Sequence, residues 1–196
     1  MIHAVKGTKD IFNSDIEKFD YVIKTAEKVF KRIGYKHIIA PTFEETSLFK
    51  RGIGEGTDIV SKEMYTFEDR GGRSLTLRPE GTAGVMRGYL EHNMARDDKL
   101  SKLYYWGPMF RAENVQAGRY REFYQFGVEA IGVDSPFLDA ELIHGAYIFL
   151  KELSLYYLEI QVNSVGCPEC RKVYREKLLA FLKPKLDKLC KDCQIR

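Results

Sequence analysis

The sequence predicts an α+β fold in which an antiparallel sheet is flanked by helices. The chain has 196 residues and is 44% hydrophobic, which is enough for one sizeable core. Strand-like runs come in pairs around turns, at MYTF and SLTL and on the two sides of NVQAGRYR. Helix-like segments stand between groups of strands instead of after each strand, which favours antiparallel pairing over a doubly wound parallel sheet.

An amphipathic helix is expected near the N-terminus. Ser14 and Glu17 fit a capping box, apolar residues recur at helical spacing as far as Ile33, and Gly34 can end the helix. The pattern predicts that one face of this helix packs on the core.

Short strands and a loop are expected next. YKHIIAP reads as a strand that Pro41 stops, and residues 43–58, FEETSLFKRGIGEGTD, read as a loop. MYTF and SLTL should pair as a hairpin because Gly71 and Gly72 can take positive φ. LRPEGTAG then leads into a helix over VMRGYLEHNM.

The C-terminal half is expected to hold a hairpin, two helices and one more strand. The strands flank NVQAGRYR, and Ser135 can start the next helix. LEIQVNS alternates apolar and polar residues as a half-buried strand does. RKVYREKLLAFLKPKLDKL reads as a helix broken near Pro184.

Charge and hydropathy exclude some classes of protein. A net charge of +3 is too small to imply nucleic-acid binding by itself. No segment approaches the roughly 18 to 20 apolar residues of a membrane span, so a cytoplasmic protein without a membrane partner is expected. In that compartment the four cysteines are not expected to form disulfides.

Alternation along the paired strands predicts a polar floor. Successive side chains of a strand point to opposite faces, so residues of equal parity lie together. One predicted face holds Tyr105, Gly107, Met109 and Arg111 from the first strand and Phe123, Gln125, Gly127 and Glu129 from the second. The other face is bulky and apolar. An alternative is that the polar groups lie on an ordinary solvated sheet face.

A third segment adds to the same polar set. In SLTLRPEGT, Thr76, Arg78 and Glu80 share a parity, and Thr82 stands where a helix begins. Carboxylates and an amide can hold an amine and a protonatable ring, whereas a planar guanidinium suits a carboxylate or phosphate.

These segments resemble the histidyl-tRNA synthetase family, a group of class II aminoacyl-tRNA synthetases. The resemblance covers nearly the whole chain and rests on KGTKDI, GYKHIIAPTFE as motif 1, TDIVSKEMY, LRPEGTAG, and GPMFRAENVQAGRYREFYQFGVEAIG as motif 2. It implies a histidine–tRNA ligase, which forms histidyl-adenylate from histidine and ATP with Mg²⁺ and then transfers the histidyl group to tRNA-His.

The resemblance also implies roles for individual residues. Arg111 matches the catalytic arginine that grips the histidine carboxylate and the α-phosphate. The arginines of the motif 2 loop, Arg119 and Arg121, would lie beside ATP and the tRNA end, or else are solvated loop charges. The implied histidine-binding set is Glu80, Gly81, Thr82, Arg111, Gln125 and Glu129, and the implied ATP-binding set is Arg111, Glu113 and Phe123.

Four cysteines near the C-terminus form two C-x2-C pairs. Cys167 and Cys170 precede Cys190 and Cys193 by a spacing found in four-thiolate zinc sites. They are candidates for a structural zinc site, or for ordinary thiols on a helical hairpin.

The expected organisation is a partial class II catalytic domain over residues 1–165, with motifs 1 and 2, and a helical cysteine-containing segment over residues 166–196. The chain ends before motif 3 and the anticodon-binding domain of the family, so we expect an N-terminal fragment that is inefficient alone. A homodimer is implied for the full-length protein. Two alternatives remain: the synthetase-like regulatory subunit of ATP phosphoribosyltransferase, and a zinc-bound module without enzymatic activity.

Overall fold

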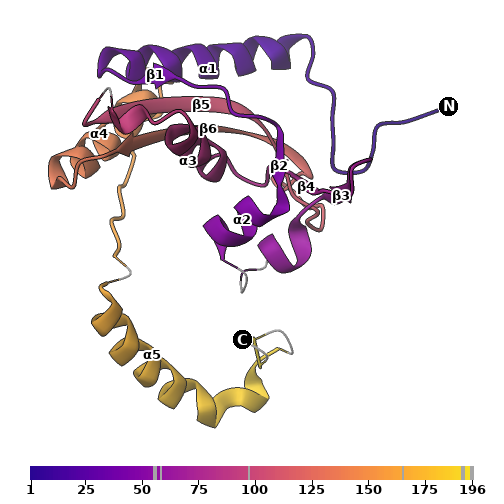
Figure 1. Cartoon of the computed structure of the whole chain (residues 1–196), viewed down its shortest axis with the longest axis vertical. Coiled ribbons are helices and arrows are strands. Elements are labelled where there is room, and N and C mark those ends of the chain that lie inside the picture. The colour runs from indigo at the N-terminus through magenta and orange to yellow at the C-terminus, as the bar shows by residue number, and fades with distance from the viewer. Residues whose placement is uncertain (55–56, 58, 97, 165, 191–192, 195–196) are drawn as a thin grey trace. The chain divides into compact units, whose positions relative to one another are not determined.

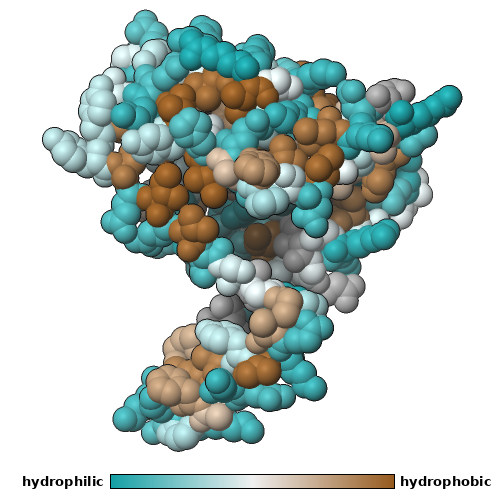
Figure 2. Space-filling model, turned by 90° about the vertical axis from the view of Figure 1, so that its left-hand side faces the viewer, coloured by the Kyte–Doolittle hydropathy of each residue, from teal (hydrophilic) through white to brown (hydrophobic). Residues whose placement is uncertain are grey.

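A computed structural model describes the chain except for residues 55–56, 58, 97, 165, 191–192 and 195–196. The described residues form two compact units, Met1–Tyr156 and Tyr157–Arg196. The predicted division after residue 165 stays a prediction. On the face shown in Figure 2, hydrophobic residues are interrupted by hydrophilic ones in both units. Among the described residues, no helix combines the length and the apolar character that crossing a membrane requires.

The main sheet of the first unit has three strands in the order β1-β5-β6. β5 (Ser101–Phe110) and β6 (Glu122–Ile131) pair antiparallel along their whole length, as predicted for the strands that flank NVQAGRYR. β1 (Lys36–His37) pairs parallel with β5, so the sheet is not antiparallel throughout.

A second sheet has the order β2-β4-β3 and is antiparallel. β3 (Thr66–Glu68) and β4 (Ser74–Leu77) form the predicted hairpin, in which Gly72 has φ +78°. β2 (Phe43–Glu45) lies on the other side of β4. The buried Thr76 hydroxyl lies 2.9 Å from the hydroxyls of Thr66 and Thr46, which satisfies a polar group inside this layer.

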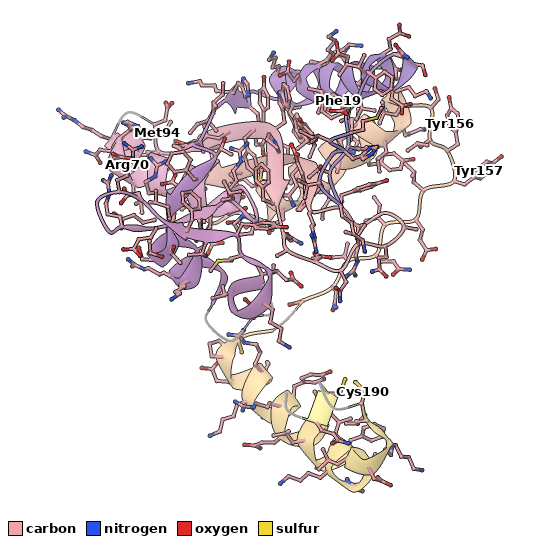
Figure 3. All side chains as sticks on the ribbon, turned by 90° about the vertical axis from the view of Figure 1, so that its right-hand side faces the viewer. Phe19, Arg70, Met94, Tyr156, Tyr157 and Cys190 are labelled. Atoms are coloured by element: carbon pink, nitrogen blue, oxygen red, sulfur yellow. The ribbon has the colours of Figure 1, made fainter. Side chains whose placement is uncertain are left out.

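Helices α1 (Ser14–Arg32) and α4 (Pro136–Glu152) lie on one side of the main sheet (Figure 1). They bury the bulky face of β5 and β6. Phe19 of α1, labelled in Figure 3, has its ring centroid 4.8 Å from that of Tyr124. The cluster on this side consists of Phe30, Tyr35 and Tyr104, with Ile33, Trp106, Phe126, Val128 and Leu142 packed against it.

The ends of these helices test two capping predictions. The Ser135 prediction is confirmed, because its side chain accepts a hydrogen bond from the Phe137 N–H at 3.3 Å. The Ser14–Glu17 capping box is wrong. α1 begins at Ser14 itself, and Asn13 at the cap position makes no side-chain cap hydrogen bond.

Helix α3 (Thr82–Glu91) lies on the opposite side of the main sheet (Figure 1) and matches the predicted VMRGYLEHNM helix. Its Val85 is fully buried. It belongs to a cluster with Leu103, Tyr105 and Met109, against which Ile38, Met94, Phe123 and Ile131 pack. A 3-10 turn, η2 (Met94–Arg96), follows the helix.

The loop expected over residues 43–58 is wrong for most of its length. Besides β2, it holds the helix α2 (Thr46–Ile53), and a π-helical turn, η1 (Ile59–Glu63), follows. The segment was read as a loop because its composition is polar and rich in glycine. Its Phe49 is fully buried, however, and this burial stabilises α2. Residues 55, 56 and 58 of the expected loop lie outside the described part.

The strand expected at LEIQVNS is also wrong. Residues 158–164 have no helix or strand assignment, and Ile160 and Val162 are 51% and 75% exposed. A strand needs a partner for its backbone N–H and C=O groups. Among the described residues, no strand pairs with this segment.

Helical structure follows this segment in the described part of the second unit. α5 (Pro168–Leu182) is followed by the 3-10 turn η3 (Lys183–Lys188), so the predicted break near Pro184 is confirmed. α5 has Cys167 at its cap position and Pro168 in its first turn. Proline is tolerated there because the N–H groups of the first turn have no partner within the helix.

Arg78 joins the two sheets of the first unit. Its side chain is buried, and its Nε donates to the Pro108 carbonyl of β5 at 2.8 Å. Its Nη1 donates to the Ala40 carbonyl, just before β2, at 2.9 Å. A Cβ atom at Gly107 would lie 2.3 Å from Arg78 Nη2, so only glycine leaves room for the guanidinium there.

Arg78→Met should destabilise the first unit by about 3 kcal/mol, because two buried carbonyl acceptors lose a charged donor. Urea unfolding followed by the fluorescence of Trp106, the one tryptophan of the chain, measures this. Arg73→Met is the matched control: Arg73 pairs with Asp69 on the surface, and its loss should cost less than about 1 kcal/mol. Equal effects of the two substitutions would contradict the role of Arg78.

Candidate active site

The side of the main sheet that faces α3 carries the predicted polar floor. Tyr105 lies opposite Gly127, Gly107 opposite Gln125, and Met109 opposite Phe123, so the residues grouped by parity share one face. Arg111 follows β5 directly, where its N–H donates to the Arg121 carbonyl at 2.9 Å. Gln125 is half-buried, and the residue opposite it on β5 is Gly107, which has no side chain.

Tyr105 fills the middle of this floor; the sequence placed it on this face but gave it no role in the site. Its ring lies between two glycines: a Cβ atom would lie 2.0 Å from the ring at Gly81 and 2.2 Å from it at Gly127. Both positions therefore exclude any side chain as long as the ring stays in place. Burial raises the pKa of Tyr105. Gly107 and Gly127 share the parity of Tyr105, and these glycines were the sequence signal that could have pointed to a large ring on this face.

Glu80 is tied to the start of α3. One carboxylate oxygen accepts from the Thr82 N–H at 2.6 Å and the other from the Ala83 N–H at 2.9 Å. These bonds satisfy two of the free N–H groups at the helix start and place a negative charge at its positive end. Each oxygen keeps a further acceptor position for a ligand.

Thr82 connects Glu80 to the carboxylate on β6. Its hydroxyl donates to Glu129 Oε1 at 2.8 Å and lies 3.5 Å from the Tyr105 hydroxyl. Burial raises the pKa of Glu129, and the nearby charge of Glu80 acts in the same direction, while the Thr82 hydrogen bond opposes both. Two carboxylates and two hydroxyls therefore meet between α3 and the sheet.

Arg111 is held at the other end of the floor. Its Nε donates to the Pro79 carbonyl at 2.9 Å, and its guanidinium carbon lies 5.0 Å from the centre of the Phe123 ring. Its Nη1 lies 3.7 Å from a carboxylate oxygen of Glu113. The guanidinium is thus oriented by a backbone acceptor and a ring face, which leaves further N–H groups for a ligand.

The loop between β5 and β6 brings further charges beside Arg111. Arg119 Nη1 lies 3.4 Å from Glu113 Oε2. The Arg121 N–H donates to the Gly7 carbonyl at 2.7 Å, so the KGTKDI segment borders the loop. A Cβ atom at Gly7 would lie 2.8 Å from the Arg121 side chain. Gly7 was also missed as a site neighbour, because sequence spacing alone does not reveal such a contact.

A cavity of about 820 Å³ opens between α2 and α3. Its lining includes Glu80 and Thr82 together with Leu48, Arg51, Met86 and Arg87. Polar site residues at the start of α3 therefore border open space.

The predicted zinc ligands lie in the second unit. Cys167 and Cys170 are exposed, with their Sγ atoms 3.3 Å apart. Cys190, labelled in Figure 3, and Cys193 lie beyond η3. Among the residues that the structure describes, no three His, Cys, Asp or Glu side chains gather in a group that could hold a metal ion. The four-thiolate site stays a prediction.

The chain is similar to known histidyl-tRNA synthetases. A family model described as histidyl-tRNA synthetase matches residues 7–170. The histidine–tRNA ligases of Syntrophotalea carbinolica and Halothermothrix orenii are 51% and 52% identical over the whole chain, which covers 46% of each relative. The chain thus spans about half the length of these curated relatives.

Solved structures give the same likeness. The structure of apo S. aureus histidyl-tRNA synthetase matches with a TM-score of 0.76 and 42% identity, covering 100% of this chain and 46% of that one. A Bacillus halodurans protein described as an ATP phosphoribosyltransferase regulatory subunit/histidyl-tRNA synthetase matches with a TM-score of 0.68 and 26% identity, over 79% of this chain and 39% of that one.

Glu129 should make the stability of the first unit fall as pH rises above 4.5, the ordinary value of a glutamate carboxyl. The folded protein holds this proton more tightly than the unfolded chain, so the contribution is present at lower pH and is lost as pH rises through the folded pKa. Glu129→Gln keeps an acceptor for Thr82 and removes the titration. Relative to wild type, the variant should gain stability across this window.

Urea unfolding at several pH values, followed by Trp106 fluorescence, measures the effect. Glu68→Gln, which changes an exposed carboxylate of β3, should keep the wild-type pH dependence. The assignment fails if Glu129→Gln follows the same pH dependence as wild type.

Proposed function

This chain belongs to the histidyl-tRNA synthetase family, and from that premise we propose that it carries the histidine-binding floor and part of the ATP-binding surface of a histidine–tRNA ligase. The reaction joins the histidine carboxylate to the α-phosphate of ATP, which gives histidyl-adenylate and releases pyrophosphate. It then transfers the histidyl group to tRNA-His and releases AMP.

One observation carries the proposal most directly: Thr82 links Glu80 and Glu129 beside Tyr105, because its N–H donates to Glu80 and its hydroxyl donates to Glu129. An imidazole offers an N–H donor, and a histidine ammonium offers three more. Glu129 would accept from the imidazole. Glu80, Thr82 and Gln125 would receive the ammonium group, with Gly81 leaving room beside Tyr105.

Arg111 is the residue proposed to act in catalysis. A guanidinium can hold a carboxylate and a phosphate at once because it presents several N–H groups in one plane. Fixed by Pro79 and Phe123, Arg111 would hold the histidine carboxylate next to the α-phosphate and oppose the negative charge that grows there.

ATP would lie beside Arg111, with Phe123 stacked on the adenine and Glu113 near it. Mg²⁺ would supply charge neutralisation on the phosphates. Arg119 and Arg121 would face the phosphates and the tRNA end.

Domain, partner and compartment proposals follow from the family. Residues 1–165 would act as part of the catalytic domain and residues 166–196 as a helical segment. Histidine, ATP and tRNA-His would be the substrates, a homodimer the assembly, and the cytoplasm the place of action. The regulatory-subunit alternative is less supported, since identity to that relative is 26%, against 51% and 52% to ligases.

Histidine titration by calorimetry tests the amino-acid floor. Glu129→Gln should weaken histidine binding about tenfold, because a neutral amide replaces the charged acceptor of the imidazole N–H. Glu68→Gln should bind as wild type does. If Glu129→Gln and Glu68→Gln bind histidine equally, Glu129 does not contact the ligand.

Histidine-dependent exchange of pyrophosphate into ATP tests Arg111. In a protein that shows this exchange, Arg111→Ala should lower the rate by about 10²- to 10³-fold, and Arg111→Lys should recover little because an ammonium lacks the planar fork. If Arg111→Lys has the wild-type exchange rate, the positive charge at this position is sufficient and the planar guanidinium has no special role.

A further inference from the structure

Two exposed thiols lie together at the start of α5. The Sγ atoms of Cys167 and Cys170 are 3.3 Å apart, about 1.3 Å longer than a disulfide bond. The Cys170 N–H donates to Cys167 Sγ at 3.4 Å. A small rotation about the side-chain bonds would therefore bring the sulfurs to bonding distance.

A basic hollow adjoins one of these thiols. It has a volume of about 990 Å³ and is lined by Cys170 with Arg171, Lys172, Tyr174 and Arg175. Small-molecule sites commonly have volumes of about 300 to 1,000 Å³. Three cationic side chains around a thiol favour an anionic reagent over a neutral one.

We propose that Cys167 and Cys170 form a reversible dithiol–disulfide site that reacts with small anionic disulfides of the glutathione type. The thiolate of Cys170 attacks one sulfur of the reagent, forms a mixed disulfide and releases one thiolate, which takes up a proton. The thiolate of Cys167 then attacks Cys170 Sγ and expels the second thiolate of the reagent, which also takes up a proton. Two protein thiols are oxidised and one small disulfide is reduced to two thiols.

The order of attack follows from the contacts. Cys170 lines the hollow and meets the reagent first. Cys167 accepts the Cys170 N–H, and its Sγ lies 3.3 Å from Cys170 Sγ, so it is placed to make the second attack. This reaction needs only the first C-x2-C pair and is an alternative to a four-thiolate zinc site.

Treatment of the protein with oxidised glutathione, followed by peptide mass mapping, tests the proposal. Wild type should lose two hydrogen atoms through a Cys167–Cys170 bond that dithiothreitol reverses. Cys167→Ser, in which serine can still cap α5, should instead accumulate a glutathione adduct on Cys170. The double variant Cys190→Ser/Cys193→Ser should still form the bond.

A comparison of reagents tests the basic hollow. Oxidised glutathione should react faster than neutral 2-hydroxyethyl disulfide, after correction for their rates with a free thiol. Arg171→Gln/Arg175→Gln should reduce that preference about two- to fivefold at low salt. If the double variant keeps the wild-type preference, the proposal that the basic hollow selects an anionic reagent is wrong.

Two results would overturn the dithiol site itself. One is adducts that stay on Cys170 in wild type without forming the Cys167–Cys170 bond. The other is stoichiometric zinc in the purified protein that protects all four thiols and is lost when any one of them is replaced.

Discussion

The buried guanidinium of Arg78 is the contact on which the positions of the other site residues depend. It connects the carbonyl before β2 to the carbonyl of Pro108 in β5, and the Arg78 carbonyl accepts the Phe110 N–H at 2.9 Å. The carbonyl of Pro79, the next residue, accepts the Arg111 Nε–H, and the Glu80 carboxylate accepts the first N–H groups of α3. Burial lowers the pKa of Arg78, yet the side chain of arginine stays charged, so these donors persist.

From this connection the site divides into two chemical halves. At one end, Glu80, Thr82 and Glu129 gather negative charge and hydroxyls around the Tyr105 ring. At the other, Arg111 supplies a positive fork. The apolar reverse side of the sheet packs on α1 and α4, so the strands that carry both halves are held rigidly. This separation suits a zwitterionic amino acid, whose ammonium and carboxylate need opposite partners.

The sequence allowed the faces of β5 and β6 to be predicted because side chains alternate along any strand. The same alternation in residues 158–162 misled, since it reports half-burial and says nothing of a partner strand. The burial of Phe49 in α2 and the pairing of β1 with β5 arise from distant contacts that local composition does not contain. The contacts of Tyr105 with Gly81 and Gly127 join three elements, so they needed the structure.

The central claim is that one face of the main sheet holds a histidine molecule between Glu129 and Arg111. Nuclear Overhauser measurements between free histidine and the protein test it most directly. The account predicts contacts from the imidazole protons to the Tyr105 ring and the Thr82 methyl group. Saturating histidine that shows contacts only to other regions of the chain would contradict it.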